Sequence, residues 1–161
     1  MFTGNGGGKT TSAFGLALRA LGQNKKVVII QFMKGRKDIG EYKAVRKFSR
    51  CTIKQFGTKE FIDLKNPAKK DIRLAEKALE FAEASLKAKP FLLVLDEINL
   101  ACSSGLVKTS DAVKLLKKCR CFVVLTGRNA PKELKDICDI VTVVEDEKSN
   151  RQNKTSKGIE Y

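Results

Sequence analysis

The sequence predicts an α/β domain of three layers, in which helices cover both faces of a mainly parallel β-sheet. Short apolar, β-branched runs alternate along the chain with segments of helical periodicity. The run KVVIIQF, residues 26–32, is apolar and β-branched, as expected of a parallel strand that is covered on both faces. Because 161 residues are about the length of one domain, we expect residues 1–161 to form a single domain.

The expected elements follow one another along the whole chain. Strands are expected over residues 26–32, 51–56, 91–97, 121–127 and 139–145. Helices are expected over residues 11–21, 67–88 and 110–119. Gly22 ends the first helix, whereas Pro67 starts the second and Pro90 stops it. The polar tail from Asp146 to Lys157 is expected to be mobile in the absence of a ligand.

The first strand departs from this regularity. Only Met1 and Phe2 precede the glycine-rich stretch that starts at Thr3, whereas a phosphate-binding loop normally follows a buried strand. Two residues are too few to build such a strand. Either the chain shown lacks its natural first strand, which we favour, or the fold tolerates a stub there.

The glycine-rich stretch TGNGGGKTT, residues 3–11, predicts a phosphate-binding loop. Its glycines remove the Cβ atoms that would keep the backbone away from phosphate oxygens, so successive N–H groups can point inward. Lys9 adds a positive charge, and the helix that follows adds the positive end of its dipole. Thr10 is placed to offer a hydroxyl to a magnesium ion.

This loop is shorter than the usual one. Counted backward from Lys9, the usual spacing of Gly, four residues and Gly-Lys-Ser/Thr would place the first glycine where the chain has Thr3. The spacing alone leaves open whether a nucleotide triphosphate is held for hydrolysis, for phosphoryl transfer or for another reaction.

Polar residues also follow two of the later strands. Asp96 and Glu97 end the most apolar run, where an acid can reach the same magnesium ion. With the glycine loop upstream, we favour metal binding by this pair over a role as a helix N-cap. Arg128 follows the next strand at the same sheet edge, and two interpretations stay open for it: a phosphate contact or a surface arginine in a turn.

The composition excludes several kinds of chemistry. The chain has no histidine, so Ser-His and Cys-His nucleophilic catalysis is excluded and a Cys/His metal site is not expected. The five cysteines form an odd set, and the close pair Cys119 and Cys121 lacks the spacing of common zinc sites. We expect reduced thiols that are buried in the core.

The net charge and the hydropathy indicate which classes of partner the protein can have. The net charge of +14 comes mainly from scattered lysines and indicates anionic ligands. In residues 68–89 the basic side chains stand between acids in helical register, which is typical of a solvated helix face rather than a nucleic-acid-binding stripe. No apolar run approaches the ~20 residues of a membrane span, and the start lacks the pattern of a secretory signal. We expect a cytoplasmic protein without a membrane partner.

Several segments, in this order, are those of one enzyme family: TGNGGGKTTSAFGLALRALG, VVIIQFMKG, the pair Gly40 and Glu41, VLDEINLA, LTGRNAP and the terminal GIEY. The chain resembles the P-loop type of ATP:corrinoid adenosyltransferase over nearly its whole length. The resemblance implies a P-loop α/β fold and commonly a homodimer. It also implies transfer of the 5′-deoxyadenosyl group of ATP to the Co(I) of a reduced corrinoid, with release of triphosphate, in cobalamin biosynthesis or salvage.

The resemblance gives the short loop a meaning. In this family the loop is one residue shorter than in hydrolases, and ATP lies reversed in it, so that the ribose 5′ carbon faces the attacking cobalt. By position, the ATP-binding residues would be Gly4, Asn5, Gly6, Gly7, Gly8, Lys9, Thr10, Thr11 and Arg128. Thr10 and Glu97 resemble the magnesium ligands, with Asp96 beside them, and Lys9, Thr10 and Glu97 would serve catalysis.

The corrinoid side of the resemblance is less complete. The family is thought to strip the lower axial ligand of the corrinoid with aromatic side chains, for which Phe56 and Phe61 are candidates here, with Glu41 as a further corrinoid contact. Core packing of the two phenylalanines is the open alternative. A flavoprotein is the reductant that the family leads us to expect. The loop has Gly7 where relatives often have lysine, and the tail lacks a Lys-His pair before the final Gly-Ile-Glu-Tyr.

Two other functions remain as alternatives. The first is a P-loop ATPase or kinase with another substrate, which would release phosphate or ADP instead of triphosphate. The second is a basic nucleic-acid-binding module that uses ATP only as a regulator.

Overall fold

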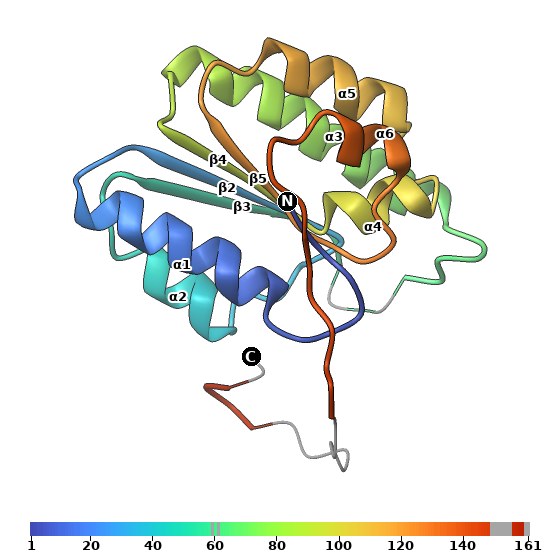
Figure 1. Cartoon of the computed structure of the whole chain (residues 1–161), viewed down its shortest axis with the longest axis horizontal. Helices are drawn as coiled ribbons and strands as arrows, with labels where there is room; N and C mark the ends of the chain where they lie inside the picture. Colours follow the sequence, from blue (N-terminus) through green and yellow to red (C-terminus); the bar gives the residue numbers. More distant parts are fainter. Residues whose placement is uncertain (59, 61, 149–155, 160–161) are drawn as a thin grey trace.

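A parallel sheet forms the centre of the molecule (Figure 1). The computed structural model describes residues 1–58, 60, 62–148 and 156–159. The strands lie in the order β3-β2-β4-β5, and each neighbouring pair is parallel. Their bounds are Val27–Phe32 for β2, Cys51–Phe56 for β3, Leu92–Asp96 for β4 and Phe122–Leu125 for β5.

Helices cover both faces of this sheet, which confirms the predicted three-layer α/β fold (Figure 1). One layer holds α1, Lys9–Gly22, and α2, Gly40–Val45. The other holds α3, Lys69–Ser85, with the 3-10 turn Leu86–Ala88, then α4, Ile98–Ser103, α5, Thr109–Lys118, and α6, Lys132–Asp136. The carboxyl ends of β2 and β4 and the start of α1 thereby meet at one edge of the sheet.

Two hydrophobic clusters hold the layers together. Side chains of β2 alternate between them, since Val27 and Ile29 pack toward α1 whereas Val28, Ile30 and Phe32 pack toward α3. β4 alternates in the same way. Every side chain of both strands is buried, including the polar Gln31 and Asp96. The most apolar runs of the sequence therefore form the central parallel strands, because a strand that is covered by helices on both faces buries every side chain.

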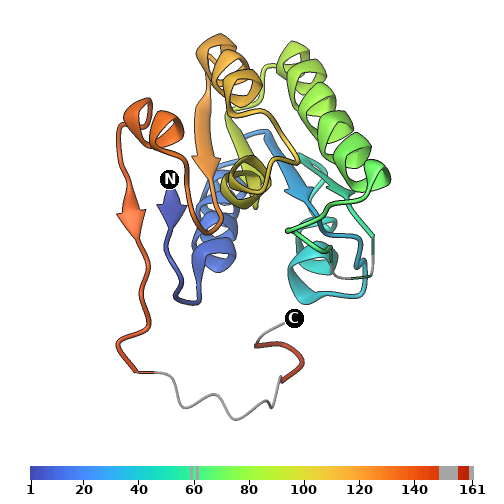
Figure 2. The same cartoon turned by 90° about the vertical axis from the view of Figure 1, so that its right-hand side faces the viewer.

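A second, shorter pairing continues the sheet on the side of β5. β1, Phe2–Thr3, pairs in parallel with β6, Thr142–Val143, and Phe2 forms an isolated bridge with Thr126 just beyond β5. Figure 2 shows β1 standing between β5 and β6. Of the predicted strand over 139–145, only Thr142–Val143 forms β6, although Ile140 and Val144 also hydrogen-bond through their backbone to the first residues of the chain. The strand at the amino terminus is thus a stub in this structure.

Most predicted elements agree with the structure to within a few residues, but three helices were missed. These are α2, α4 and α6, which span five or six residues each. Such segments are too short to show helical periodicity. The cysteines also differ from expectation: all five are free, but only Cys102 is fully buried and the others are partly exposed. None of the helices in the described part of the chain is long and apolar enough to cross a membrane.

Candidate nucleotide-binding site

A cavity of about 570 Å³ lies at the sheet edge where α1 begins. It gathers backbone from the glycine loop, cations from three separate segments and one acid that follows β4. The lining residues are Gly6, Gly7, Gly8, Lys9, Thr10, Thr11, Phe14, Lys34, Gly40, Glu41, Glu97, Arg128, Gly158 and Ile159. The structure therefore brings most of the predicted ATP-binding residues together.

Gly4 and Gly6 are required by a close approach of the chain itself. A Cβ on Gly4, whose φ is +99°, would collide with the carbonyl oxygen of Val144. A Cβ on Gly6 would lie 2.7 Å from the carbonyl carbon of Glu145. The Gly6 N–H donates to the Val144 carbonyl at 2.8 Å. These glycines therefore admit the segment that follows β6, and neither Gly4 nor Asn5 lines the cavity.

Gly7 and Gly8 form the part of the loop that faces the cavity. The Gly7 N–H donates to Oδ1 of Asp146 at 2.9 Å, so a carboxylate of the protein already lies on the loop. Gly8 has a φ of +93°, a conformation that favours glycine, and directly precedes α1. The first turn of α1 presents its N–H groups in the same direction, which is the arrangement that attracts an anion.

Asp96 is completely buried and accepts four hydrogen bonds. Its Oδ1 accepts hydrogen bonds from the hydroxyl of Thr10 at 2.9 Å and from the hydroxyl of Thr126 at 2.6 Å. Its Oδ2 accepts hydrogen bonds from Nε2 of Gln31 at 3.0 Å and from Nζ of Lys34 at 2.8 Å. Burial alone would raise the pKa of Asp96, but the Lys34 charge and these hydrogen bonds outweigh burial and hold the pKa below its ordinary value.

Lys34 is a charged residue of the site that the sequence reasoning missed. Its ammonium pairs with Asp96 and lies 3.4 Å from Oγ1 of Thr10, while it also lines the cavity. Burial would lower its pKa, but Asp96 outweighs burial and raises the pKa above its usual value. Lys34 could have been identified from its place in the sequence, because it follows β2 closely and the carboxyl ends of parallel strands lie at the same edge of the sheet as Asp96.

Glu97 differs from Asp96 in almost every respect. It lines the cavity. Among the hydrogen bonds of the described residues given above, none is accepted by its carboxylate. Burial, followed by the negative charge of Asp96, raises its pKa. Its backbone has a φ of +66° and its N–H donates to Oγ1 of Thr126 at 2.9 Å, which fixes the turn out of β4. A cation in the cavity would relieve this partly buried charge.

Two further cations face the loop. Nζ of Lys9 donates to the carbonyl oxygen of Gly6, and burial together with the Arg128 charge lowers the pKa of Lys9. Arg128 lines the cavity, so the structure places it near the loop, as one of its two interpretations requires. Among the residues described, the positive side chains of the cavity thus come from the loop, from the end of β2 and from the turn after β5.

Of the candidate corrinoid residues, the structure describes Glu41 and Phe56. Glu41, at the start of α2, lines the cavity. Phe56 is 9% exposed and packs against Phe81 of α3, with ring centroids 5.6 Å apart, which favours its core interpretation. Phe61 lies outside the described residues. Its proposed contact therefore stays a prediction.

The whole chain, residues 1–161, matches the family model described as ATP:corrinoid adenosyltransferase BtuR/CobO/CobP. The chain belongs to this family. The match extends from the glycine loop to the terminal segment, so it includes every element that lines the cavity. The parallel sheet, with the loop at the start of α1 and acids at the end of β4, is consistent with the P-loop fold of such a member.

Individual relatives agree with the family match. A corrinoid adenosyltransferase of Pseudomonas aeruginosa is 34% identical over 165 residues, covering 99% of this chain and 81% of its own. One of Sinorhizobium is 31% identical over 167 residues, covering 99% of this chain and 78% of its own. One of Escherichia coli K12 is 29% identical over 145 residues, covering 88% of this chain and 73% of its own.

Proposed function

We propose that this adenosyltransferase transfers the 5′-deoxyadenosyl group of ATP to the Co(I) of a reduced corrinoid and releases triphosphate, in cobalamin biosynthesis or salvage. The observation that carries the proposal is the composition of the cavity. The backbone of the glycine loop at the start of α1 and the cations Lys9, Lys34 and Arg128 line it. These groups neutralise the charge of a departing triphosphate, which makes it a good leaving group.

The reaction needs no general base on the protein. Co(I) is itself a strong nucleophile, and its attack on the 5′ carbon breaks the bond to the triphosphate oxygen without a proton transfer. The absence of histidine from the chain is compatible with this chemistry. The work left to the protein is to align the two substrates and to hold the leaving group. A reversed ATP in the short loop would direct its ribose toward the corrinoid.

The donors at this site fit a magnesium ion. The Thr10 hydroxyl donates a hydrogen bond to Asp96 at 2.9 Å and accepts one from Lys34 at 3.4 Å, so one lone pair of its oxygen remains for a cation. Glu97 adds a carboxylate that lines the cavity. We assign the metal ligation to Thr10 and Glu97. Asp96 has all its acceptor positions engaged and acts by orienting Thr10. A bound magnesium ion would supply further charge neutralisation on the triphosphate.

The wider setting of the proposal follows the family. We propose a single domain, a homodimer in the cytoplasm and a flavoprotein as the source of the electron that makes Co(I). The carboxyl-terminal Gly158 and Ile159 line the cavity, which supports a role for the tail in covering the substrates. Glu41 is the candidate contact for the corrinoid.

The decisive experiment identifies the products. The purified protein is incubated with ATP, magnesium and chemically reduced cobalamin, and the products are separated by chromatography. We expect a light-sensitive cobalt–carbon product and triphosphate in equal amounts. Phosphate or ADP in place of triphosphate would instead establish an ATPase or kinase.

A matched pair of variants ties the reaction to the cavity. Lys9→Ala removes a cavity cation, whereas Lys25→Ala removes a lysine at the far end of the sheet that does not line the cavity. We expect the first to lose at least about 100-fold in kcat/KM and the second to retain activity. Equal activity of both variants would contradict the assignment of the site.

A further inference from the structure

The ammonium of Lys34 lies among the oxygen atoms that the magnesium assignment uses. Its Nζ is 3.4 Å from Oγ1 of Thr10 and 2.8 Å from Oδ2 of Asp96. Glu97, the other assigned ligand, lines the same cavity, and its negative charge also acts on Lys34. A cation of the protein and a divalent ion therefore have the same group of oxygen atoms as partners.

Lys34 also balances the charge of Asp96. Of the four side chains that donate hydrogen bonds to this carboxylate, those of Thr10, Thr126 and Gln31 are neutral and that of Lys34 is charged. Asp96 is completely buried, and a buried carboxylate is strongly unfavourable without a cation close to it. Lys34 meets this need without a metal ion.

The backbone on both sides of Lys34 is fixed against the end of β3. Met33 has a φ of +58°, which is uncommon for a residue other than glycine, and its N–H donates to the Phe56 carbonyl at 2.9 Å. A Cβ on Gly35 would lie 2.7 Å from the Gly57 carbonyl oxygen, so the two segments pass close to each other. The backbone of Lys34 is therefore held at this edge of the sheet by contacts that do not involve Asp96.

The position of this ammonium opposes the entry of a metal ion. The Thr10 oxygen keeps one lone pair, but an ion bound there would stand close to a positive charge that repels it. A triphosphate changes the balance, because its oxygens offer the long and flexible lysine side chain another anionic partner. The Lys34 side chain is 26% exposed and lines the cavity, so its ammonium has access to a phosphate there.

We propose that Lys34 keeps divalent ions out of the site until a triphosphate binds. Its ammonium takes the place of a metal ion beside Thr10, Asp96 and Glu97. A phosphate draws the ammonium away, and the metal ion then enters together with the nucleotide. The inference rests on the proposed function, in which Thr10 and Glu97 are the metal ligands, and it adds that metal and triphosphate bind cooperatively.

The test measures the binding of Mn²⁺, a paramagnetic substitute for Mg²⁺, to the full chain without nucleotide. Mn²⁺ broadens the NMR resonances of residues close to it. In the parent protein, Mn²⁺ alone should leave the amide resonances of Thr10 and Glu97 sharp. In Lys34→Met the same resonances should broaden, and the Kd for Mn²⁺ should fall at least about 10-fold, because Asp96 has lost its cation. Equal broadening in the parent and in Lys34→Met would overturn the proposal.

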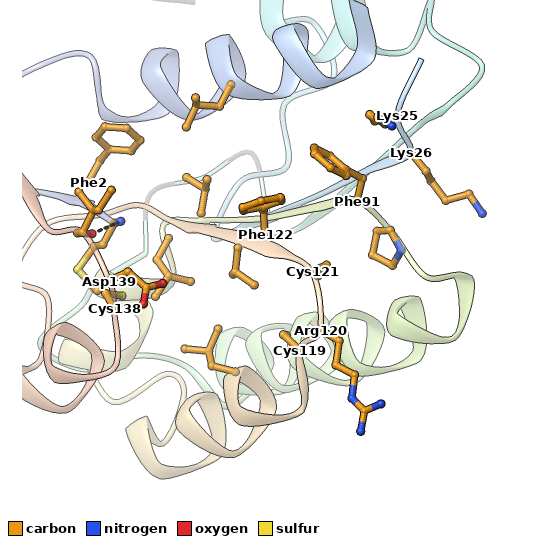
Figure 3. A pocket seen from close by; sticks show the side chains of 18 of the residues that line it. Phe2, Lys25, Lys26, Phe91, Cys119, Arg120, Cys121, Phe122, Cys138 and Asp139 are labelled. Atoms are coloured by element: carbon orange, nitrogen blue, oxygen red, sulfur yellow. Dashed lines mark hydrogen bonds between the residues drawn. The ribbon is translucent and has the colours of Figure 1, made fainter. Parts of the chain in front are cut away.

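Two matched variants separate the charge at position 34 from the overall charge. Lys34→Arg keeps the positive charge and should behave as the parent does. Lys25→Met makes the same substitution in a second cavity, of about 1280 Å³, which shares no lining residue with the nucleotide-binding cavity. Figure 3 shows Lys25 beside Phe91 there, and its Nζ lies 5.5 Å from the ring centroid. Broadening in Lys25→Met as strong as that in Lys34→Met would also refute the proposal.

Inorganic tripolyphosphate distinguishes a failure of this inference from a failure of the metal assignment. With Mn²⁺ and tripolyphosphate together, the Thr10 and Glu97 resonances of the parent should broaden. If they stay sharp, the metal assignment is wrong and this inference falls with it. If they broaden but Mn²⁺ alone leaves Lys34→Met unchanged, the metal assignment stands and the role of Lys34 is refuted.

The parent protein alone tests the proposal if Lys34→Met does not fold. Tripolyphosphate without a metal ion should shift the side-chain ¹³Cε resonance of Lys34, because the ammonium exchanges Asp96 for phosphate. A Lys34 resonance that stays in place while tripolyphosphate binds would contradict the proposal.

Discussion

Thr10 and Asp96, which are 86 positions apart in the sequence, are joined by a hydrogen bond of 2.9 Å that links the glycine loop to the end of β4. The bond fixes the direction of the Thr10 hydroxyl proton. We predict that Asp96→Asn lowers kcat/KM by about 100-fold or more, because the amide turns a donor toward groups that are themselves donors. Enzyme kinetics with wild-type protein as reference provide the measurement, and Lys25→Ala, which changes no residue of the cavity, is the control.

The stability of the parent protein, unlike that of Asp96→Asn, should depend on the ionisation of Asp96. The pKa of Asp96 is lower in the folded protein than its unfolded value of about 3.9. Its ionised form therefore stabilises the fold above that value, and the contribution is lost as the pH falls through the folded pKa. Denaturant unfolding between about pH 5 and pH 2 should show a steeper loss for the parent than for Asp96→Asn, because the transition begins near the unfolded value and continues below it. Parallel curves would contradict the prediction.

Glu97→Gln should have the opposite effect on stability. The pKa of Glu97 is raised in the folded protein, so its ionisation destabilises the fold as the pH rises from the unfolded value of about 4.3 through the folded pKa. At pH 7 the variant should be more stable than the parent, and the difference should vanish near pH 3.

The activity of Glu97→Gln should nevertheless fall by about 100-fold or more at limiting magnesium. If Glu97 is a metal ligand, the KM for magnesium rises while the Tm does not fall. A drop in both activity and Tm would point to a structural role for Glu97. The measurements are a magnesium titration of the initial rate and a thermal melt on the same preparation.

Lys34→Met should destabilise the protein strongly. Asp96 has no exposed surface, and removing the ammonium 2.8 Å from its Oδ2 leaves a buried carboxylate without its ion-pair partner. We expect a loss of about 2–4 kcal/mol, at the lower end of a buried pair because Lys34 itself is 26% exposed. Urea unfolding measures the loss. The double variant with Asp96→Asn should cost less than the sum of the two single changes.

Substitutions at two glycines should separate close approach from conformational freedom. In Gly6→Ala the new Cβ would lie 2.7 Å from the Glu145 carbonyl carbon, so the segment after β6 has to move away from the loop. We expect a lower Tm and weaker ATP binding by calorimetry. Gly15→Ala is the control, since its Cβ meets nothing within 4 Å on an exposed helix face and should stabilise α1 by about 0.5–1 kcal/mol.

Phe56→Leu and Glu41→Gln should distinguish the two interpretations of the corrinoid side. Phe56 packs against Phe81, so its truncation should cost about 1–2 kcal/mol of stability and leave the KM for the corrinoid unchanged. Glu41 lines the cavity, so its change should raise that KM without lowering the Tm. A raised KM for the corrinoid in Phe56→Leu, at an unchanged Tm, would instead support a contact between Phe56 and the corrin ring.

The central strands could be predicted from the sequence because a strand buried on both faces needs a continuous run of apolar residues. VVIIQF has no polar alternation, and each of its side chains is buried between two helical layers. The turn from β4 into Glu97 was also predictable, since two acids at the end of an apolar run are unusual. Short helices such as α2 left no such mark, because one or two turns are stabilised by tertiary packing rather than by their own sequence.

The partner of Asp96 could not be predicted in the same way. Lys34 lies 62 positions away from it, and nothing in the sequence states which lysine of a lysine-rich chain reaches a buried acid. The reason for Gly4 and Gly6 was equally hidden. Their spacing predicted a phosphate cradle, whereas the structure shows that they admit the backbone of residues 144–146. Long-range approaches of this kind depend on topology, which local patterns do not encode.

The carboxylate of Asp146 on the Gly7 N–H has a consequence for how the loop takes up an anion. A phosphate that binds the Gly7 N–H would have to take the place of this carboxylate, so uptake there would be an exchange of one anion for another rather than a simple addition. The affinity of the loop for phosphate would then report the difference between the two anions in their binding to this N–H group.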